Sequence, residues 1–308
     1  MTTQETIAIN WQEPTEPELT AARRIRRNFG RLARNRLAIV GLLLCVLFFF
    51  VGLAGLVIWS VDSLHELYLD QDLNNTLQPP LAGGSVFGTD QFGRDLLVRI
   101  VAGIGVSLSV AVSVTAFTLI AGMIVGVVSA YYGGWVDRII SGVIDVTWGF
   151  PVILIAVVLS GVFEPGIQIV FVSLCVILWS GFARIIRGQA LSLREQDFVK
   201  ASRAMGVPDW RIMLRHFVPN LIAPTVVMGS YYIPVVIIAE GALSFIGLGA
   251  QQPTPSLGLM IADGRQFLQS HHWAVTIPSI FLVLIAVGFN TLGDGLRDVL
   301  DPRLRSVR

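Results

Sequence analysis

Charge is scarce in this sequence. Asp, Glu, Lys and Arg together make up 14% of its 308 residues, whereas a soluble domain carries roughly 25%. Hydrophobic residues account for 54%, and the mean hydropathy is +0.70. A chain with so little charge cannot cover its surface with groups that water solvates, so the composition excludes an ordinary soluble protein. Lipid must cover much of the surface instead.

Lysine and cysteine are scarcer still, and each shortage excludes a kind of site. The only lysine is Lys200, and it follows Val199. A nucleotide-binding P-loop requires Gly-Lys-Ser/Thr, so this chain cannot hydrolyse ATP through one. Cys45 and Cys175, the two cysteines, stand in apolar runs, which predicts small buried hydrophobes rather than a disulfide framework. The four histidines form no metal-ligand pattern, so we expect no metal in the chain.

Long runs with few charged residues divide the chain into membrane spans, each of which needs roughly 20 apolar residues. The expected spans cover residues 37–59, 100–136, 139–163, 166–183, 221–249 and 274–292. We therefore predict an all-α, polytopic membrane protein with six transmembrane helices. The first helix stands apart in the sequence, and the other five form a core at residues 100–292.

The remaining segments are polar, and their charge predicts which side of the membrane each occupies. They are an N-terminal tail with a basic block (1–36), an extramembrane segment (60–99), a long loop within the core (184–219) and a C-terminal tail (293–308). Of the 22 lysines and arginines, all except Arg94, Arg99 and Arg265 lie on the side that holds both tails and the 184–219 loop. Positive charge accumulates in cytoplasmic loops. We therefore place both termini in the cytoplasm and residues 60–99 outside. Anionic lipid accounts for the basic clusters, so no nucleic-acid partner is expected.

The 184–219 loop contains signals for two short helices. Ser192 and Glu195 have the spacing of a capping box, which predicts a helix over residues 193–205. Gly206 is the expected stop of that helix. The second helix is expected to start after Pro208, at residue 209, and to end at about residue 217, before Pro219.

The first of these helices is predicted to have one compact apolar face. Phe198, Ala201, Ser202 and Met205 share that face at helical spacing. Such a face suits insertion into a groove of a soluble partner, or contact with the surface of the bilayer. The spacing alone leaves both interpretations open.

The same loop resembles the EAA loop of ATP-binding-cassette (ABC) importer permeases. The segments that carry the resemblance are Val199–Gly206 and Arg215–Asn220. Ala201, Gly206 and Pro219 match the family pattern. Ser202 replaces its second alanine, and Lys200 stands where the family usually has glutamate. That charge reversal prevents transfer of any salt bridge made by the family glutamate.

Four further segments resemble the C-type permease subunits of dipeptide and oligopeptide importers. They are Asn28–Arg36, Phe87–Asp95, Leu248–Gly258 with Ala262–Arg265, and Phe289–Asp298 with Asp301–Arg303. The resemblance implies a type I ABC importer permease fold in a bacterial inner membrane. It also implies a sister permease forming a heterodimer, two ATPase subunits that bind ATP and magnesium, and an extracytoplasmic solute-binding protein. The chain itself would be non-catalytic and would hold no cofactor.

The resemblance also supplies candidate residues for contact with the ATPase subunits. In the family this loop contains the coupling helix that docks on the ATPase. Gly206 would set the turn of the loop. The residues expected to support or make the contact are Phe198, Lys200, Ala201, Ser202, Arg203, Met205 and Trp210.

The solute pathway is less visible in the sequence. Pro224 and Pro234 are expected to break span five, and broken helices often line cavities. Glu240 in the same span is either a pathway residue, because a buried charge is costly, or a structural group hydrogen-bonded to another helix. Asp145 in span three has the same two interpretations, with Arg138 as its expected partner.

Two other classes of function compete with the transport subunit. An ion-coupled secondary transporter would need intramembrane ion-coupling residues and often shows internal repeats, but the sequence offers only two candidate carboxylates. An intramembrane aspartyl enzyme would have to pair Asp145 with Asp294. The transporter class leaves the 184–219 loop unexplained. The enzyme class would place Asp294 at the cytoplasmic end of span six, and no second motif surrounds Asp145. The transported solute stays open, because specificity in this family resides largely in the binding protein.

Overall fold

The computed structural model describes residues 36–300, so nearly all of the predicted N-terminal tail and the last eight residues of the C-terminal tail lie outside it. The described chain is helical and contains no β-strand. Its principal helices are α2 (Arg36–Ser60), α4 (Leu96–Tyr132), α5 (Gly134–Trp148), α6 (Val152–Ser160), α7 (Ile167–Arg194), α8 (Asp197–Ala204), α9 (Asp209–Ile212), α10 (Val218–Phe245), α11 (Leu257–Gly264) and α12 (Trp273–Leu300). The short helix α3 (Glu66–Leu69) lies in the extramembrane segment.

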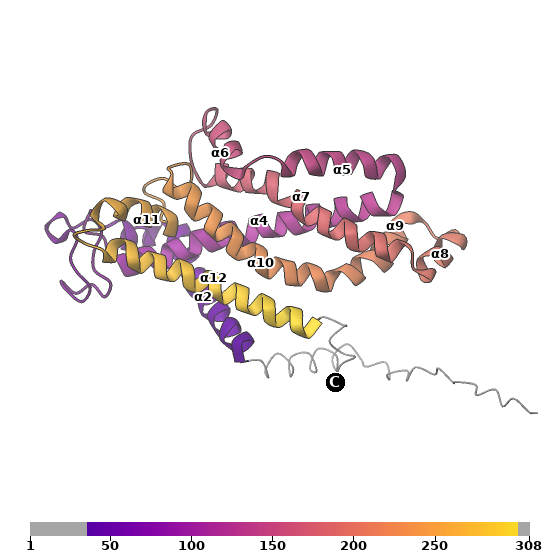
Figure 1. Ribbon diagram of the computed structural model, residues 1–308. Coiled ribbons are helices and arrows are strands. Elements are labelled where there is room, and N and C mark those ends of the chain that lie inside the picture. The colour runs from indigo at the N-terminus through magenta and orange to yellow at the C-terminus, as the bar shows by residue number, and fades with distance from the viewer. Residues whose placement is uncertain (1–35, 301–308) are drawn as a thin grey trace, which may run out of the picture.

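Five stretches of the described chain are long and apolar enough to cross a membrane, and a bent pair of helices makes up to six. The predicted all-α, polytopic class is therefore confirmed. The bundle is elongated, with α11 and the 61–95 segment at one end and α8 and α9 at the other (Figure 1).

The third predicted span is not one straight helix. Helices α5 and α6 replace it, and their axes differ in direction by 77°. The break falls at Gly149-Phe150-Pro151, where the chain leaves helical geometry. Proline disfavours helical backbone angles in the residue before it, so Pro151 ends α5 and starts a new helix. Hydropathy averages over this break and cannot detect it.

Several helices are longer than the predicted spans. Helix α4 has 37 residues and is therefore about 55 Å long at 1.5 Å per residue, well beyond a hydrocarbon core of roughly 30 Å. Helices α7 and α12 likewise continue into segments predicted as loop and tail. The reason is packing. Val127 of α4 and Ile186 of α7 belong with Phe217 to a second apolar cluster, and Val299 of α12 packs with Ala38 of α2 in a smaller one. A helix can continue past the membrane when protein covers it.

Close contacts between glycines set the crossing of α2 and α4. A Cβ atom on Gly55 would overlap the carbonyl oxygen of Val101 and lie 2.7 Å from its carbonyl carbon. Gly105 faces the same crossing, against the backbone of Gly55 and Leu56. Small residues that let backbones approach are characteristic of helix packing in membranes.

Replacing Gly55 with alanine is therefore expected to destabilise the protein by about 1–3 kcal/mol, the usual cost of overpacking a tight contact. Thermal unfolding of the detergent-purified protein measures the effect. The matched control is Gly142→Ala, because a Cβ atom on Gly142 meets nothing within 4 Å. Equal melting temperatures for the two variants would show that the crossing tolerates a methyl group.

Candidate functional site

The start of the first loop helix differs from the prediction. Ser192 lies inside the last turn of α7, which ends at Arg194, and α8 begins at Asp197 after the extended residue Gln196. The predicted capping box at Ser192 and Glu195 is therefore wrong. Leu191 and Leu193 pack against the second apolar cluster, and this contact keeps α7 helical through the position of the expected cap.

Gly206 ends α8 as predicted. Its φ angle is +75°, in the left-handed region. The N–H of Gly206 donates to the carbonyl of Arg203 at 3.0 Å, and the N–H of Val207 donates to the carbonyl of Ser202 at 3.2 Å. These two bonds form a Schellman motif, which favours glycine because its left-handed residue carries no Cβ strain. The expected sharp turn between two short helices is confirmed.

The second loop helix does not end before Pro219. Helix α9 continues through a π-helical turn, Met213–Phe217, directly into α10. Pro219 follows the π-helical turn directly and stands in the first turn of α10. Residues 209–245 therefore form one continuous helical segment. This segment runs from the loop through the whole length of α10.

One face of α8 is buried and the other is exposed, but the division differs from the prediction. Ser202 is only 7% exposed and lies inward with Val199. The Ser202 hydroxyl donates to the carbonyl of Phe198 at 2.8 Å. Ser202 therefore does not belong to an exposed contact face. The buried Val199 belongs to the second apolar cluster, and it draws this side of α8 onto the bundle.

The exposed face of α8 and α9 carries large apolar side chains at their end of the bundle. Met205 is 74% exposed, Trp210 is 57% exposed and Phe198 is 43% exposed. Ala201 and Lys200 are exposed beside them. Lys200 lies 3.4 Å from Glu195, and hydrogen bonding from Lys200 and then Arg194 lowers the pKa of the Glu195 carboxyl. This surface combines apolar area with a charged rim, which is the usual composition of a protein interface.

Arg203 fastens α8 to the end of α4. Its guanidinium lies over the Tyr131 ring at 4.1 Å from the ring centre and donates to the Tyr131 carbonyl at 2.8 Å. The Tyr131 hydroxyl in turn donates to Asp209 at 2.6 Å. A direct contact of Arg203 with a partner stays a prediction, but the structure gives this side chain a positioning role within the chain.

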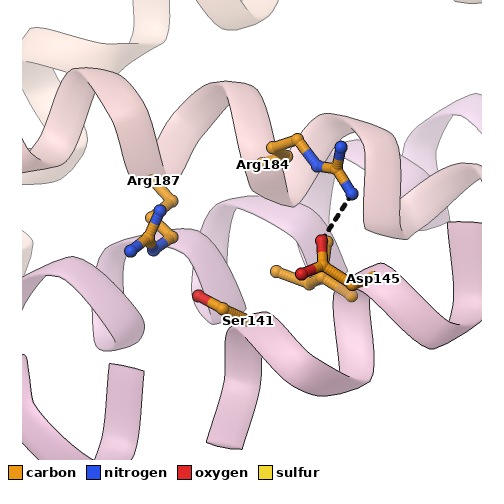
Figure 2. Close-up of a pocket in the computed structure, with 5 residues that line it drawn as sticks. Ser141, Asp145, Arg184 and Arg187 are labelled. Atoms are coloured by element: carbon orange, nitrogen blue, oxygen red, sulfur yellow. Dashed lines mark hydrogen bonds and ion pairs between the residues drawn. The ribbon is translucent and has the colours of Figure 1, made fainter. Parts of the chain in front are cut away.

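A polar pocket of about 240 Å³ lies between α5 and α7, and Figure 2 shows the residues that line it. Arg184 donates to Asp145 at 2.7 Å. The expected partner, Arg138, is wrong, since its guanidinium lies instead over the Trp135 ring. Arg187, the next arginine on α7, makes two hydrogen bonds to Asp137, of 2.5 and 2.6 Å.

Glu240 is enclosed within the bundle. It is 1% exposed and accepts hydrogen bonds from Ser107 of α4 at 2.9 Å and from Ser244 at 2.8 Å. These contacts match the alternative in which Glu240 ties two helices together. A role in the pathway stays a prediction.

The prolines of α10 do not break it. Helix α10 runs continuously through Pro224 and the buried Pro234, contrary to the expected interruption. Thr225 and Ser230 donate their hydroxyls to carbonyls of the same helix. Proline is tolerated in membrane helices that pack against neighbouring helices, as α10 does against α4 and α12. Pro234 therefore marks no visible gap, and its place in a pathway is likewise untested.

Asp294, the other aspartate considered for catalysis, lies between α10 and α12. Asp294 of α12 accepts a hydrogen bond from the Tyr231 hydroxyl of α10 at 2.6 Å. Asp145 is paired with Arg184 of α7. The structure gives these two aspartates separate partners on separate helices rather than a shared site.

Two sequence motifs that had no assigned role meet at the end of the bundle opposite α8 and α9 (Figure 1). Asp90 lies 2.6 Å from Arg94 and 3.4 Å from Arg99. Arg94 donates to Gln252 at 3.0 Å, and the Gln252 amide donates to Asp263. Burial raises the pKa of the Asp263 carboxyl, and hydrogen bonding from Gln252 partly offsets that rise. We call Asp90, Arg94, Arg99, Gln252 and Asp263 the outer polar cluster.

The outer polar cluster was missed because its members are far apart in the sequence. Arg94 and Gln252 are separated by 158 positions. The available signal was the charge pattern of two motifs, each of which carries both arginine and aspartate in a segment between spans. Hydropathy identifies both segments as extramembrane, but it does not predict that they pack together.

The sequence matches two known families. The first is described as binding-protein-dependent transport system inner membrane component and matches residues 119–306. The second is the N-terminal transmembrane domain of oligopeptide transport permease C and matches residues 21–80. The matches lie in different parts of the chain and together cover most of it.

Curated relatives are similar over nearly their whole length. The dipeptide transport system permease protein DppC of Alkalihalophilus pseudofirmus is 38% identical, over 95% of this chain and 94% of the relative. The oligopeptide transport system permease protein OppC of Haemophilus influenzae is 36% identical, over 89% and 87%. The glutathione transport system permease protein GsiD of Pectobacterium atrosepticum is 34% identical, over 91% and 92%.

A solved structure is similar in fold. It is the methionine ABC transporter MetNI in an inward-facing conformation, matched with a TM-score of 0.54 and 20% identity. The alignment covers 66% of this chain and 97% of the matched chain. This likeness bears on the arrangement of helices alone.

Proposed function

Because the chain belongs to the family of binding-protein-dependent transport system inner membrane components, we propose that it forms half of a translocation pathway for di- or oligopeptides. It is a permease subunit of an ABC importer. The peptide class is supported by the names of relatives at 36–38% identity. A relative named for glutathione transport supports the same general chemistry, a small solute built of amide bonds and carboxylates.

The exposed face of α8 and α9 is the observation that carries the proposed mechanism. Met205, Trp210 and Phe198 present apolar area at one end of the bundle, and the inward residues Val199 and Ile212 hold that surface in place. An apolar helix face of this kind fits a groove on a soluble subunit. We assign it to the ATPase subunits, which would bind ATP and magnesium and supply the energy.

The continuous segment 209–245 explains how motion at that face would reach the membrane. Trp210 stands near one end of this segment and Glu240 near the other. Glu240 is bonded to Ser107 of α4, so a tilt of the segment would move α4 as well. Alternating access then requires two packings of the same bundle. In this mechanism the chain is non-catalytic and acts as the moving part of an ATP-driven complex.

The same proposal sets the membrane orientation and the other partners. The end with α8 and α9 faces the cytoplasm together with both termini, as the distribution of arginine supports. The outer polar cluster then lies on the extracytoplasmic side, where a solute-binding protein would dock. A sister permease completes the pathway as a heterodimer in the bacterial inner membrane.

Co-purification of the tagged chain from detergent-solubilised native membranes tests the proposal. We expect two ATPases, a second permease and a peptide-binding protein to accompany it, identified by mass spectrometry. Peptide-stimulated ATP hydrolysis should appear only when all of them are present. A chain that purifies alone as a stable oligomer and transports solute in response to an ion gradient would contradict the proposal.

A further inference from the structure

The pocket between α5 and α7 contains an exposed ion pair, Arg184 with Asp145. The pair lies where the uncharged stretch of α7 ends. On α7, residues 167–183 carry no charge, and Arg184 is the next residue. Its side chain is 49% exposed, and that of Asp145 is 70% exposed. Both side chains line the pocket between α5 and α7 (Figure 2). Exposed charges at this depth need water or protein beside them, because hydrocarbon cannot solvate them.

Helix α5 turns two unlike faces to its surroundings. Ile139, Val143 and Val146 are exposed on one face, and this apolar face suits lipid or an apolar protein surface. Ser141 and Asp145 lie on the opposite face and line the pocket with Arg184. The polar face is therefore directed into the seam between α5 and α7.

The two arginines of the pocket are held differently. Arg187 makes two bonds to Asp137, and Asp137 also accepts a bond from Ser129 of α4 at 2.6 Å. These contacts join α4, α5 and α7, so Arg187 is structural. Arg184 makes one hydrogen bond, to Asp145, in an exposed pair of a kind worth at most about 1 kcal/mol. A ligand carboxylate can replace such a partner at little cost.

We propose that Arg184 binds the terminal carboxylate of the transported peptide, and that Asp145 occupies the position of that carboxylate when the site is empty. This inference rests on the proposed function, and it identifies a contact residue for the substrate. The chemistry is that of a guanidinium with a carboxylate, which forms strong, oriented hydrogen bonds. The pocket, at about 240 Å³, is smaller than the roughly 300–1,000 Å³ of sites that enclose a whole small molecule. It therefore fits one end of a peptide.

The test is uptake by the complete complex, with its partner subunits and binding protein, in vesicles of phosphatidylcholine and phosphatidylglycerol. The probes are the dipeptide alanyl-alanine and its C-terminal amide, each at a concentration that saturates the binding protein. We expect Arg184→Gln to reduce uptake of alanyl-alanine about tenfold, the effect of one charge-assisted hydrogen bond. Uptake of the amide should stay within about twofold of wild type, since the amide has no carboxylate to lose.

Two further variants separate this role from a structural one. Arg138→Gln removes an arginine of α5 that lies against Trp135, and it should leave uptake of both probes unchanged. The exchanged pair Arg184→Asp with Asp145→Arg should keep the ion pair but impair alanyl-alanine selectively. Full recovery of both probes in the exchanged variant would overturn the proposal in favour of a structural pair.

Two other outcomes also contradict the assignment. Equal losses for both probes in Arg184→Gln would assign the arginine to lipid headgroups or to coupling, and full uptake of both probes by this variant would exclude carboxylate recognition. A wild-type complex that takes up neither probe gives a different result: it contradicts dipeptide transport, the part of the proposed function on which the assignment of Arg184 rests.

Discussion

Replacing Trp210 with alanine is expected to abolish ATP-driven uptake by removing the ATPase subunits from the complex. Trp210 is 57% exposed at the end of the bundle, and the Arg211 guanidinium lies over its ring. Tryptophan and arginine are enriched among the residues that dominate binding energy, and truncating such a residue costs about 2 kcal/mol or more. That cost corresponds to a roughly 30-fold weaker complex.

The expected loss does not require the chain to unfold. The neighbouring Ile212 and Phe217 are fully buried and anchor α9 and the π-helical turn to the bundle. The melting temperature of Trp210→Ala should therefore match that of wild type, while the ATPase subunits dissociate during gel filtration. A matched control is Phe163→Ala, because Phe163 is an aromatic residue of similar exposure, 62%, between α6 and α7. Retention of the ATPases by Trp210→Ala would remove this tryptophan from the contact.

The second large effect is expected at the outer polar cluster. Asp90 accepts hydrogen bonds from the backbone N–H groups of Phe92 and Arg94 and from the Arg94 side chain. Arg94 and Arg99 are 3% and 1% exposed. Neutralising Asp90 by Asp90→Asn leaves two buried guanidinium groups without their nearest carboxylate. Breaking a buried ion pair from one side costs about 3–5 kcal/mol.

Limited proteolysis and thermal unfolding of the purified protein measure this effect. We expect Asp90→Asn to lower the melting temperature and to make the 61–95 segment sensitive to protease. Asp62→Asn serves as the control, because Asp62 lies in the same segment with a fully exposed side chain and should tolerate the change. If the two variants have the same melting temperature, the outer polar cluster contributes little to holding the two motifs in contact.

The interior of the 184–219 loop shows where local signals succeed and where they fail. Gly206 was predicted as a helix stop, and the Schellman hydrogen bonds confirm it. A left-handed residue is a property of a few adjacent positions, so local sequence identifies it. Ser192 and Glu195 carried an equally local signal for a helix start, but burial of Leu191 and Leu193 kept α7 helical through it. Tertiary packing overrode the capping preference.

The buried face of α8 and the ion-pair partner of Asp145 depended on contacts between segments, which no local sequence pattern contains. Helical spacing placed Ser202 on the same face as Phe198, but it did not decide which face of α8 would be buried. The buried Val199 decided it. Similarly, Arg138 is close to Asp145 in sequence, whereas the observed partner Arg184 lies 39 positions away on α7. The packing of α5 against α7 creates that pair.

The sequence by itself determined the membrane class, the approximate spans, the absence of a P-loop and the turn at Gly206. Each of these follows from composition, or from a window of residues whose hydropathy and backbone preferences act within one segment. The tertiary structure alone decided the exposed face of α8, the partners of Asp145 and Glu240, and the contact of Arg94 with Gln252. These features depend on which helices touch, and that choice is made by packing and buried hydrogen bonds between residues far apart in the chain.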